Sequence, residues 1–202
     1  MATPRSSPLG LVVLLNLFEG PSHAYRLQKL IEATGKDRVV NVRSRASLYQ
    51  AIERLERHGL VEVVGTVSGS SYPDRVEYAI TERGREVARD WLREMLSSTG
   101  EEFPEFIAAI SLVFALEPAE ARAELERREQ RLADELTSTE AELASAPAGL
   151  PRLFLLEEEY RRALLEAELV WVRNVIDDLR SGRLTWSEEW LREIGQQFLT
   201  DE

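Results

Sequence analysis

One short stretch of the chain, NVRSRASLYQ, combines guanidinium, hydroxyl and amide side chains. Arginine side chains such as those of Arg43 and Arg45 can neutralise phosphate groups or donate two hydrogen bonds to guanine O6 and N7. The amide of Gln50 can pair with adenine, and the hydroxyls of Ser47 and Tyr49 can bond phosphate oxygens. The residue types in this stretch therefore indicate contact with a nucleic-acid duplex.

The same stretch opens a segment that has the period of an α-helix. From about Ser44, the apolar residues Leu48, Ala51, Ile52 and Leu55 recur at the spacing of one buried helical stripe. The outward-facing residues are then Ala46, Gln50, Glu53 and Arg57, with Ser47, Tyr49 and Arg54 on the flanks. The small side chain of Ala46 would let such a helix approach a partner closely.

The flanking segments are expected to hold this helix in place. Residues 9–18 read as a first helix, Ser22 as the N-cap of a second helix through residue 34, and residues 60–68 and 75–80 as two strands. Thr81 is expected to cap a fourth helix without a capping box, because Gly84 stands where a capping box needs Glu or Gln.

This order of elements predicts a winged helix-turn-helix. In such folds the recognition helix enters the major groove with its N-terminal residues. The loop from residue 68 to 75 would form the wing. The further residues expected near phosphates are His23 and Tyr25 of the second helix and Ser70, Ser71, Tyr72 and Arg75 of the wing.

Other roles compete at several of these positions. Arg57 and Glu53 are i, i+4 neighbours that can form a solvated pair, and Arg54 can pair with surrounding glutamates. Because Glu53 is a poor neighbour for phosphate, the helix is expected to insert only by its first turns. His23 stands at a helix start, where capping or packing is an equal alternative to phosphate contact.

Composition limits the other functions that the chain could have. It has 202 residues, no cysteine and two histidines, which excludes disulfides and His-rich metal sites and favours a cytoplasmic location. Gly35-Lys36 lacks the earlier glycine of a phosphate-binding loop, because Leu30 stands there. We therefore expect no enzyme, metal or cofactor. The longest apolar run, residues 9–18, is too short for a membrane span.

Charge separates the chain into two parts. Residues 1–90 hold 13 Lys/Arg and 11 Asp/Glu, a net of +2, whereas residues 91–202 hold 12 and 25, a net of −13. Such asymmetry suggests different roles, and a basic surface on one part is enough for DNA. We predict a DNA-binding domain at 1–97 and an all-helical domain at 98–202, so that the fold class is mainly α with a small β-hairpin wing.

The acidic part is expected to form dimers. Long helices are predicted at 118–145 and 152–181, and Leu125, Leu132, Leu136 and Leu143 give the first a partial coiled-coil seam. The apolar stripe predicted to bury against a partner chain is Leu164, Ala167, Trp171, Val175 and Leu179, continued at its start by Tyr160. A twofold homodimer would present two recognition helices to successive major grooves.

All four tryptophans lie after residue 90, and flat aromatic side chains suit planar ligands. Trp91 and Trp171 are the candidates for an effector site that takes a small aromatic ligand. The alternative for each is packing in a core or a dimer contact.

Three segments of the first part together resemble the PadR family of transcriptional regulators. They are GPSHAYRLQKLI, ASLYQAIERLERHGLVE and RVEYAITERGREVARDWL, with the L-Y-x-A-[IL]-x-R-L-E-x-x-G-L and Y-x-[IL]-T-x-x-G signatures at 48–60 and 78–84. Ala24-Tyr25 and Ala46-Ser47 stand where family members usually carry Gly-Tyr and Gly-Thr, so Ser47 keeps the hydroxyl.

The resemblance covers about residues 9–96, and the long helical tail is similar to the larger subgroup, whose C-terminal helices dimerise. It implies a repressor that binds double-stranded DNA as a homodimer on an inverted repeat. It also implies an aromatic effector, because a tryptophan in the fourth helix stacks on ligands in smaller members and Trp91 occupies a similar helix. The alternative is a winged-helix adaptor that binds proteins and never DNA.

Overall fold

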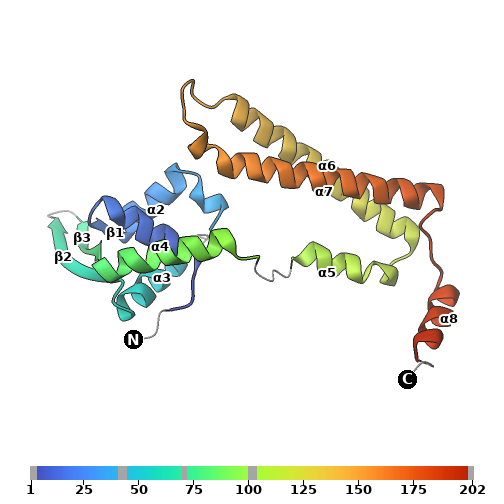
Figure 1. The fold of residues 1–202 in the computed structure, drawn as a ribbon, viewed down its shortest axis with the longest axis horizontal. Helices are drawn as coiled ribbons and strands as arrows, with labels where there is room; N and C mark the ends of the chain where they lie inside the picture. The colour runs from blue at the N-terminus through green and yellow to red at the C-terminus, as the bar shows by residue number, and fades with distance from the viewer. Residues whose placement is uncertain (1–3, 41–44, 70–71, 100–103, 200–202) are drawn as a thin grey trace. The chain divides into compact units, whose positions relative to one another are not determined.

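The computed structural model describes residues 4–40, 45–69, 72–99 and 104–199 (Figure 1). The chain forms two compact units, Met1–Glu101 and Glu102–Glu202. No helix among these described ranges is both long enough and apolar enough to cross a membrane.

Four helices build the N-terminal unit, and each contributes one apolar face to a single core. They are α1 (Pro8–Asn16), α2 (Ala24–Ala33), α3 (Arg45–Arg57) and α4 (Glu82–Ser97), with short 3-10 turns at Leu17–Glu19 and Lys36–Arg38. Leu14 of α1, Leu27 of α2 and Leu55 of α3 are almost fully buried in this core. The connector after α2 begins with the second 3-10 turn, and residues 41–44 lie outside the described part.

A three-stranded antiparallel sheet completes the unit, in the order β1-β3-β2. Its strands are β1 (Ser22–His23), β2 (Val61–Gly69) and β3 (Tyr72–Ile80). Strand β3 begins at Tyr72, so the prediction that residues 68–75 form one loop is wrong. Residues Tyr72 and Arg75 belong to the strand because Gly69 pairs with Tyr72 and Val67 with Arg75.

The first strand also corrects the predicted start of α2. Ser22 pairs with Tyr78 of β3, and this pairing holds its backbone extended. His23 is therefore the N-cap, and its Nδ1 accepts a hydrogen bond of 3.0 Å from the backbone N–H of Arg26. The prediction that Ser22 caps the helix is wrong, since a two-residue strand leaves no local pattern from which its distant partner could be inferred.

The corner between α3, β2 and α4 is closed by hydrogen bonds and one close backbone contact. The Thr81 hydroxyl accepts from the backbone N–H of Gly84 at 3.0 Å, which confirms the predicted cap, and donates to the carbonyl of Gly59 at 2.8 Å. Gly84 lies against the carbonyl of Leu60, where an added Cβ would stand only 2.0 Å from the oxygen. Glycine at 84 thus lets α4 begin directly beside β2.

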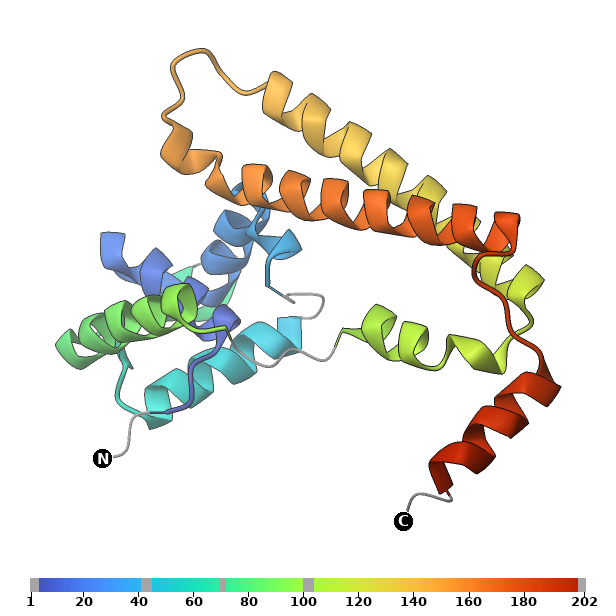
Figure 2. The ribbon, with the colours of Figure 1, turned by 45° about the vertical axis from the view of Figure 1, so that its right-hand side comes forward.

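The C-terminal unit is all helical. Its elements are α5 (Glu105–Ser111), a 3-10 turn at Val113–Ala115, α6 (Pro118–Ala144), a 3-10 turn at Arg152–Phe154, α7 (Leu156–Ser181) and α8 (Glu188–Leu199). Figures 1 and 2 show α6 and α7 side by side as a long hairpin. Ion pairs between Arg173 and Glu129 at 2.8 Å and between Arg180 and Glu126 at 3.2 Å tie the two helices together.

The stripe of α7 that is buried within its own unit is not the stripe that was predicted from the sequence. The buried side chains are Leu165, Leu169, Val172 and Ile176, which pack with Leu125 and Leu132 of α6. Of the predicted stripe, Val175 and Leu179 are half-buried beside this core, while Tyr160, Leu164, Ala167 and Trp171 are exposed. Both stripes have helical spacing, so the position of α6 decides which one is covered.

Candidate nucleic-acid interface

Helix α3 has the two faces that its sequence predicts. Leu48, Ala51, Ile52 and Leu55 are each 4% exposed or less, and they fix the helix to the core. On the other side Ala46, Gln50, Glu53 and Arg54 are exposed, and Tyr49 is 47% exposed. Ser47 lies at the margin and is half-buried. The groups expected to meet a duplex thus stand on the solvent side of a rigid helix.

Six of the predicted contact residues lie at or near the gaps between the described ranges. Arg43, Ser70 and Ser71 lie outside the described residues. Only the backbone is described for Arg45, the first residue of α3, and for Tyr72 and Arg75 in β3. The part of the wing that is described therefore consists of the paired β2 and β3 backbones.

The start of α2 presents a second set of polar groups. Because His23 Nδ1 accepts the capping hydrogen bond, the N–H of the neutral ring is at Nε2, where it can donate. The Tyr25 ring stacks on this imidazole with centroids 6.3 Å apart, and the Lys29 ammonium lies 6.0 Å from the Tyr25 centroid. Tyr25 is 46% exposed. His23 therefore takes the capping role, and the same geometry leaves one donor for a phosphate.

Tyr78 also belongs to this region, although it was not among the predicted site residues. Its burial raises the pKa of the phenol above 10.0, and Glu56, Tyr49 and Glu53 of α3 raise it further. The phenol therefore stays protonated through the physiological range and faces the recognition helix from β3. The Tyr-x-Ile-Thr motif that contains it was the available signal.

The C-terminal end of α3 is held from α4. The Arg83 guanidinium donates to the carbonyl of His58 at 2.9 Å, next to the Thr81 contact with Gly59. In the last turn of α3, Arg57 Nε donates to the backbone carbonyl of Glu53 at 3.4 Å. The carbonyls of His58 and Gly59 lie just beyond the last turn of α3, where backbone acceptors lack helical partners, and these bonds satisfy them. The arrangement fixes the far end of α3 and leaves the side chains of its first turns facing solvent.

The geometry of this unit agrees with its likeness to known sequences. Residues 13–90 match the family model described as the transcriptional regulator PadR-like family. Residues 13–90 therefore form a PadR-like domain. The match includes α2, α3, the hairpin and most of α4, so it covers every described residue of the candidate interface. No curated protein matches the chain by sequence.

Solved structures of PadR-like proteins share the fold over most of the chain. Bacillus subtilis PadR in complex with operator DNA is 13% identical, with a TM-score of 0.66, and the likeness covers 86% of this chain and 99% of that one. The same protein in complex with p-coumaric acid is 14% identical, with a TM-score of 0.66 and the same coverage. The Vibrio cholerae virulence activator AphA is 21% identical, with a TM-score of 0.65, over 86% and 98% of the two chains.

The two tryptophans predicted to meet an effector have different surroundings in this chain. Trp91 is 3% exposed inside the N-terminal core, where its ring would lie 3.2 Å from a Cβ added at Gly10. It has the packing role that was the alternative to ligand binding. Trp171 is 44% exposed, and its ring meets the Phe106 ring edge-on with centroids 6.0 Å apart.

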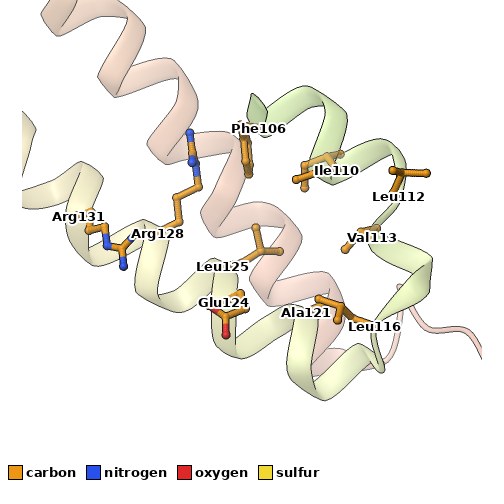
Figure 3. Close-up of a pocket in the computed structure, with 11 residues that line it drawn as sticks. Phe106, Ile110, Leu112, Val113, Leu116, Ala121, Glu124, Leu125, Arg128 and Arg131 are labelled. Carbon is orange, nitrogen blue, oxygen red and sulfur yellow. The ribbon is translucent and has the colours of Figure 1, made fainter. Parts of the chain in front are cut away.

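Phe106, which contacts Trp171, also lines a groove within the C-terminal unit. The Arg128 guanidinium lies 3.5 Å from the centroid of the Phe106 ring and is ion-paired with Glu168. The groove between α5 and α6 has a volume of about 250 Å³ and is mostly apolar (Figure 3). Figure 3 shows Arg128 rising from α6 toward Phe106 at one end of this groove. No motif in the sequence indicates this groove, since α5 is short.

Proposed function

We propose that this PadR-like protein is a sequence-specific transcriptional repressor. In this proposal a homodimer binds an inverted-repeat operator and blocks polymerase, and a small aromatic effector relieves the block. The observation that carries the proposal is the exposed N-terminal face of α3, where Ala46, Tyr49 and Gln50 face solvent on a helix anchored by its opposite side.

The side chains of this face support recognition of specific bases and not only attraction to the phosphate backbone. Gln50 can make two hydrogen bonds to adenine, and Ala46 can contact a thymine methyl group. Tyr49 and the donor of His23 can bond phosphates on either side of the groove and fix the register. Glu53 lies one turn beyond Tyr49 and limits insertion to the first half of the helix. Bacillus subtilis PadR, which has a similar fold, is known in complex with operator DNA, and this supports DNA as the proposed partner.

The dimer is supported by the apolar side chains that α7 leaves uncovered within its own unit. Leu164 is 53% exposed and Trp171 is 44% exposed, while the buried stripe of the same helix packs on α6. Large exposed apolar patches on a helix are typical of protein interfaces. A twofold contact through this face would give a symmetric dimer that carries two copies of α3.

The effector is proposed to act through the same face. Trp171 belongs both to the exposed stripe of α7 and to the ring contact with Phe106, so a planar ligand stacked there would touch the dimer contact itself. Such a ligand changes DNA affinity only if it binds the two dimer geometries with different affinity. The p-coumaric acid complex of Bacillus subtilis PadR is the precedent for a small aromatic ligand.

One experiment tests the proposal as a whole. The purified chain is offered random duplex DNA, and the bound fragments are selected and sequenced. For a repressor dimer, the selected fragments should share an inverted repeat. The logarithm of its DNA-binding constant should fall linearly with the logarithm of the salt concentration, with a slope near −0.9 for each neutralised phosphate. Arg45→Ala lowers DNA affinity and leaves the dimer mass unchanged. A protein-binding adaptor returns no enriched sequence and shows no such slope.

A second candidate function is activation, because the activator AphA shares the fold with a TM-score of 0.65. Both functions need the same operator contact. Transcription in vitro from a promoter that carries the selected repeat separates them, since repression lowers transcript yield as protein is added and activation raises it.

A further inference from the structure

Helix α8 leaves its apolar face uncovered. Trp190, Leu191 and Ile194 share one side of the helix, and Trp190 is 49% exposed. No side chain described between residues 188 and 197 is buried. Figures 1 and 2 both show α8 apart from the α6–α7 hairpin. A strongly amphipathic helix in this condition needs a partner surface to bury its apolar side.

The groove between α5 and α6 is a second uncovered apolar surface in the same unit. Ile110, Val113 and Leu125 line its interior. Its neighbourhood is also apolar, since Ile107 is 65% exposed and Phe114 is 49% exposed. None of the residues of α5 or of the 3-10 turn that follows it is buried. Large exposed side chains around the groove suit a helix more than a small molecule, because a small ligand would leave them uncovered.

The two surfaces begin at the same point of the fold. The indole Nε1 of Trp186 donates a hydrogen bond of 2.9 Å to the carbonyl of Leu116, and Leu116 lines the groove. Ser187 alone separates Trp186 from the first residue of α8. The start of α8 is therefore fixed at the edge of the groove while the helix itself stands away from it.

The charges of the two surfaces are complementary. Helix α8 carries Glu188, Glu189 and Glu193 against the single Arg192. The charged residues that line the groove are Glu124, Arg128 and Arg131. Glu124 is ion-paired with Arg127 and Arg128 with Glu168, whereas Arg131 has no ion pair within the described part of the chain. An arginine at the edge of an apolar groove favours an acidic amphipathic helix over a basic one.

We propose that α8 of one copy docks in the α5–α6 groove of a second copy, and that the second copy returns the same contact. This inference rests on the proposed homodimer and names the elements that lock it. A twofold axis makes such an exchange reciprocal, so one kind of contact covers both uncovered surfaces on both copies. Trp190 and Ile194 enter the apolar part of the groove, and the glutamates of α8 lie near Arg131.

The absence of cysteine from the natural sequence allows a direct test. The full chain is made with Ile194→Cys on α8 and Ile110→Cys in the groove, then oxidised and run without reductant. Exchange gives a covalent species of twice the 23.0 kDa chain mass that reductant dissolves. An intrachain disulfide, which means that α8 closes on its own groove, overturns the proposal, and so does the lack of any disulfide.

Three controls make the result specific. Each single variant must stay free of covalent dimer, and Ile194→Cys combined with Leu150→Cys in the loop between α6 and α7 must do the same. Equal cross-linking in these controls overturns the proposal. Circular dichroism confirms that Ile110→Cys remains folded.

A second measurement separates this proposal from the proposed function. Light scattering of the unmodified chain gives its mass in solution, and a monomer at all concentrations overturns both. A dimer without the expected disulfide overturns only the docking of α8. Trp190→Asp is expected to raise the dimer dissociation constant roughly tenfold or more, and Arg192→Asp, on the same helix, to change it far less. Equal effects of the two variants contradict the proposed docking face.

Discussion

The Cα of Gly84 faces the backbone carbonyl of Leu60 so closely that a Cβ at this position would lie 2.0 Å from the oxygen. This contact joins the first turn of α4 to the start of β2, next to the end of the recognition helix. The neighbour is backbone and not a flexible side chain, so it cannot move aside without displacing the strand.

Gly84→Ala is therefore expected to destabilise the N-terminal unit by about 1–3 kcal/mol, the usual cost of overpacking. Urea unfolding followed by circular dichroism measures this change. Gly195→Ala in α8 is the matched control, because nothing lies within 4 Å of its added Cβ. Equal stability of Gly84→Ala and the unmodified chain would show that α4 does not pack against Leu60 in this way.

Tyr78 predicts a loss of stability in alkaline solution. The folded chain raises the pKa of this phenol above 10.0, chiefly by burial, so folding favours its protonated form. The stabilising contribution is complete below pH 10 and is lost as the pH rises through the folded pKa. Tyr78→Phe should lose less stability than the unmodified chain as the pH is raised above 10, as measured by urea unfolding. A larger loss in the variant would reverse the sign and refute the assignment.

Gln50 is expected to read one base pair in each half of the operator. Gln50→Ala should reduce discrimination at that position by about 1–3 kcal/mol and leave the other positions unchanged. Binding of a panel of singly substituted operators measures this effect. Gln130→Ala, an exposed amide of α6, serves as the control. A uniform loss across all operators would instead assign Gln50 to the phosphate backbone.

Leu164 tests the dimer face of α7. Leu164→Glu places a charge in the exposed stripe and should shift the mass in solution from dimer toward monomer, since an unpaired buried charge is costly. Val170→Glu is the comparison, because Val170 is 59% exposed but lies outside the predicted stripe. Analytical ultracentrifugation reads both variants. If Val170→Glu dissociates the dimer and Leu164→Glu does not, the dimer interface lies on another side of α7.

Trp171 tests the effector. Planar phenolic or cationic compounds should quench tryptophan fluorescence in the unmodified chain and in Trp91→Phe, because Trp91 is buried in the core. Trp171→Phe should abolish the response. A flat titration of the unmodified chain across a broad panel, or a response that survives Trp171→Phe, would argue against this site.

The features that could be predicted from the sequence are those that depend on residues close together in the chain. The buried stripe of α3 was predicted because Leu48, Ile52 and Leu55 repeat at helical spacing within one segment. The cap at Thr81 was predicted for the same reason. Both signals need only residues within three or four positions of each other, and both are confirmed in the structure.

The features that were missed depend on contacts between distant segments. Strand β1 exists because Ser22 pairs with Tyr78. Because of this pairing, the N-cap of α2 is His23 and not the predicted Ser22. The face of α7 that is buried depends on α6, since Leu164 and Leu165 are neighbours in sequence and only the second one packs inward. The core position of Trp91 likewise follows from α1, where Gly10 leaves room for its ring.

The position of α3 on DNA is measured most directly by cleavage from the helix itself. Ala46→Cys introduces the sole thiol of the chain on the exposed face of α3, where an iron–EDTA group can be attached. On the selected operator, we expect cuts centred within both halves of the inverted repeat, in the pattern of a reagent held in the major groove. Cuts confined to the flanks of the bound site, or no cuts on an operator that the labelled protein still binds, would contradict it.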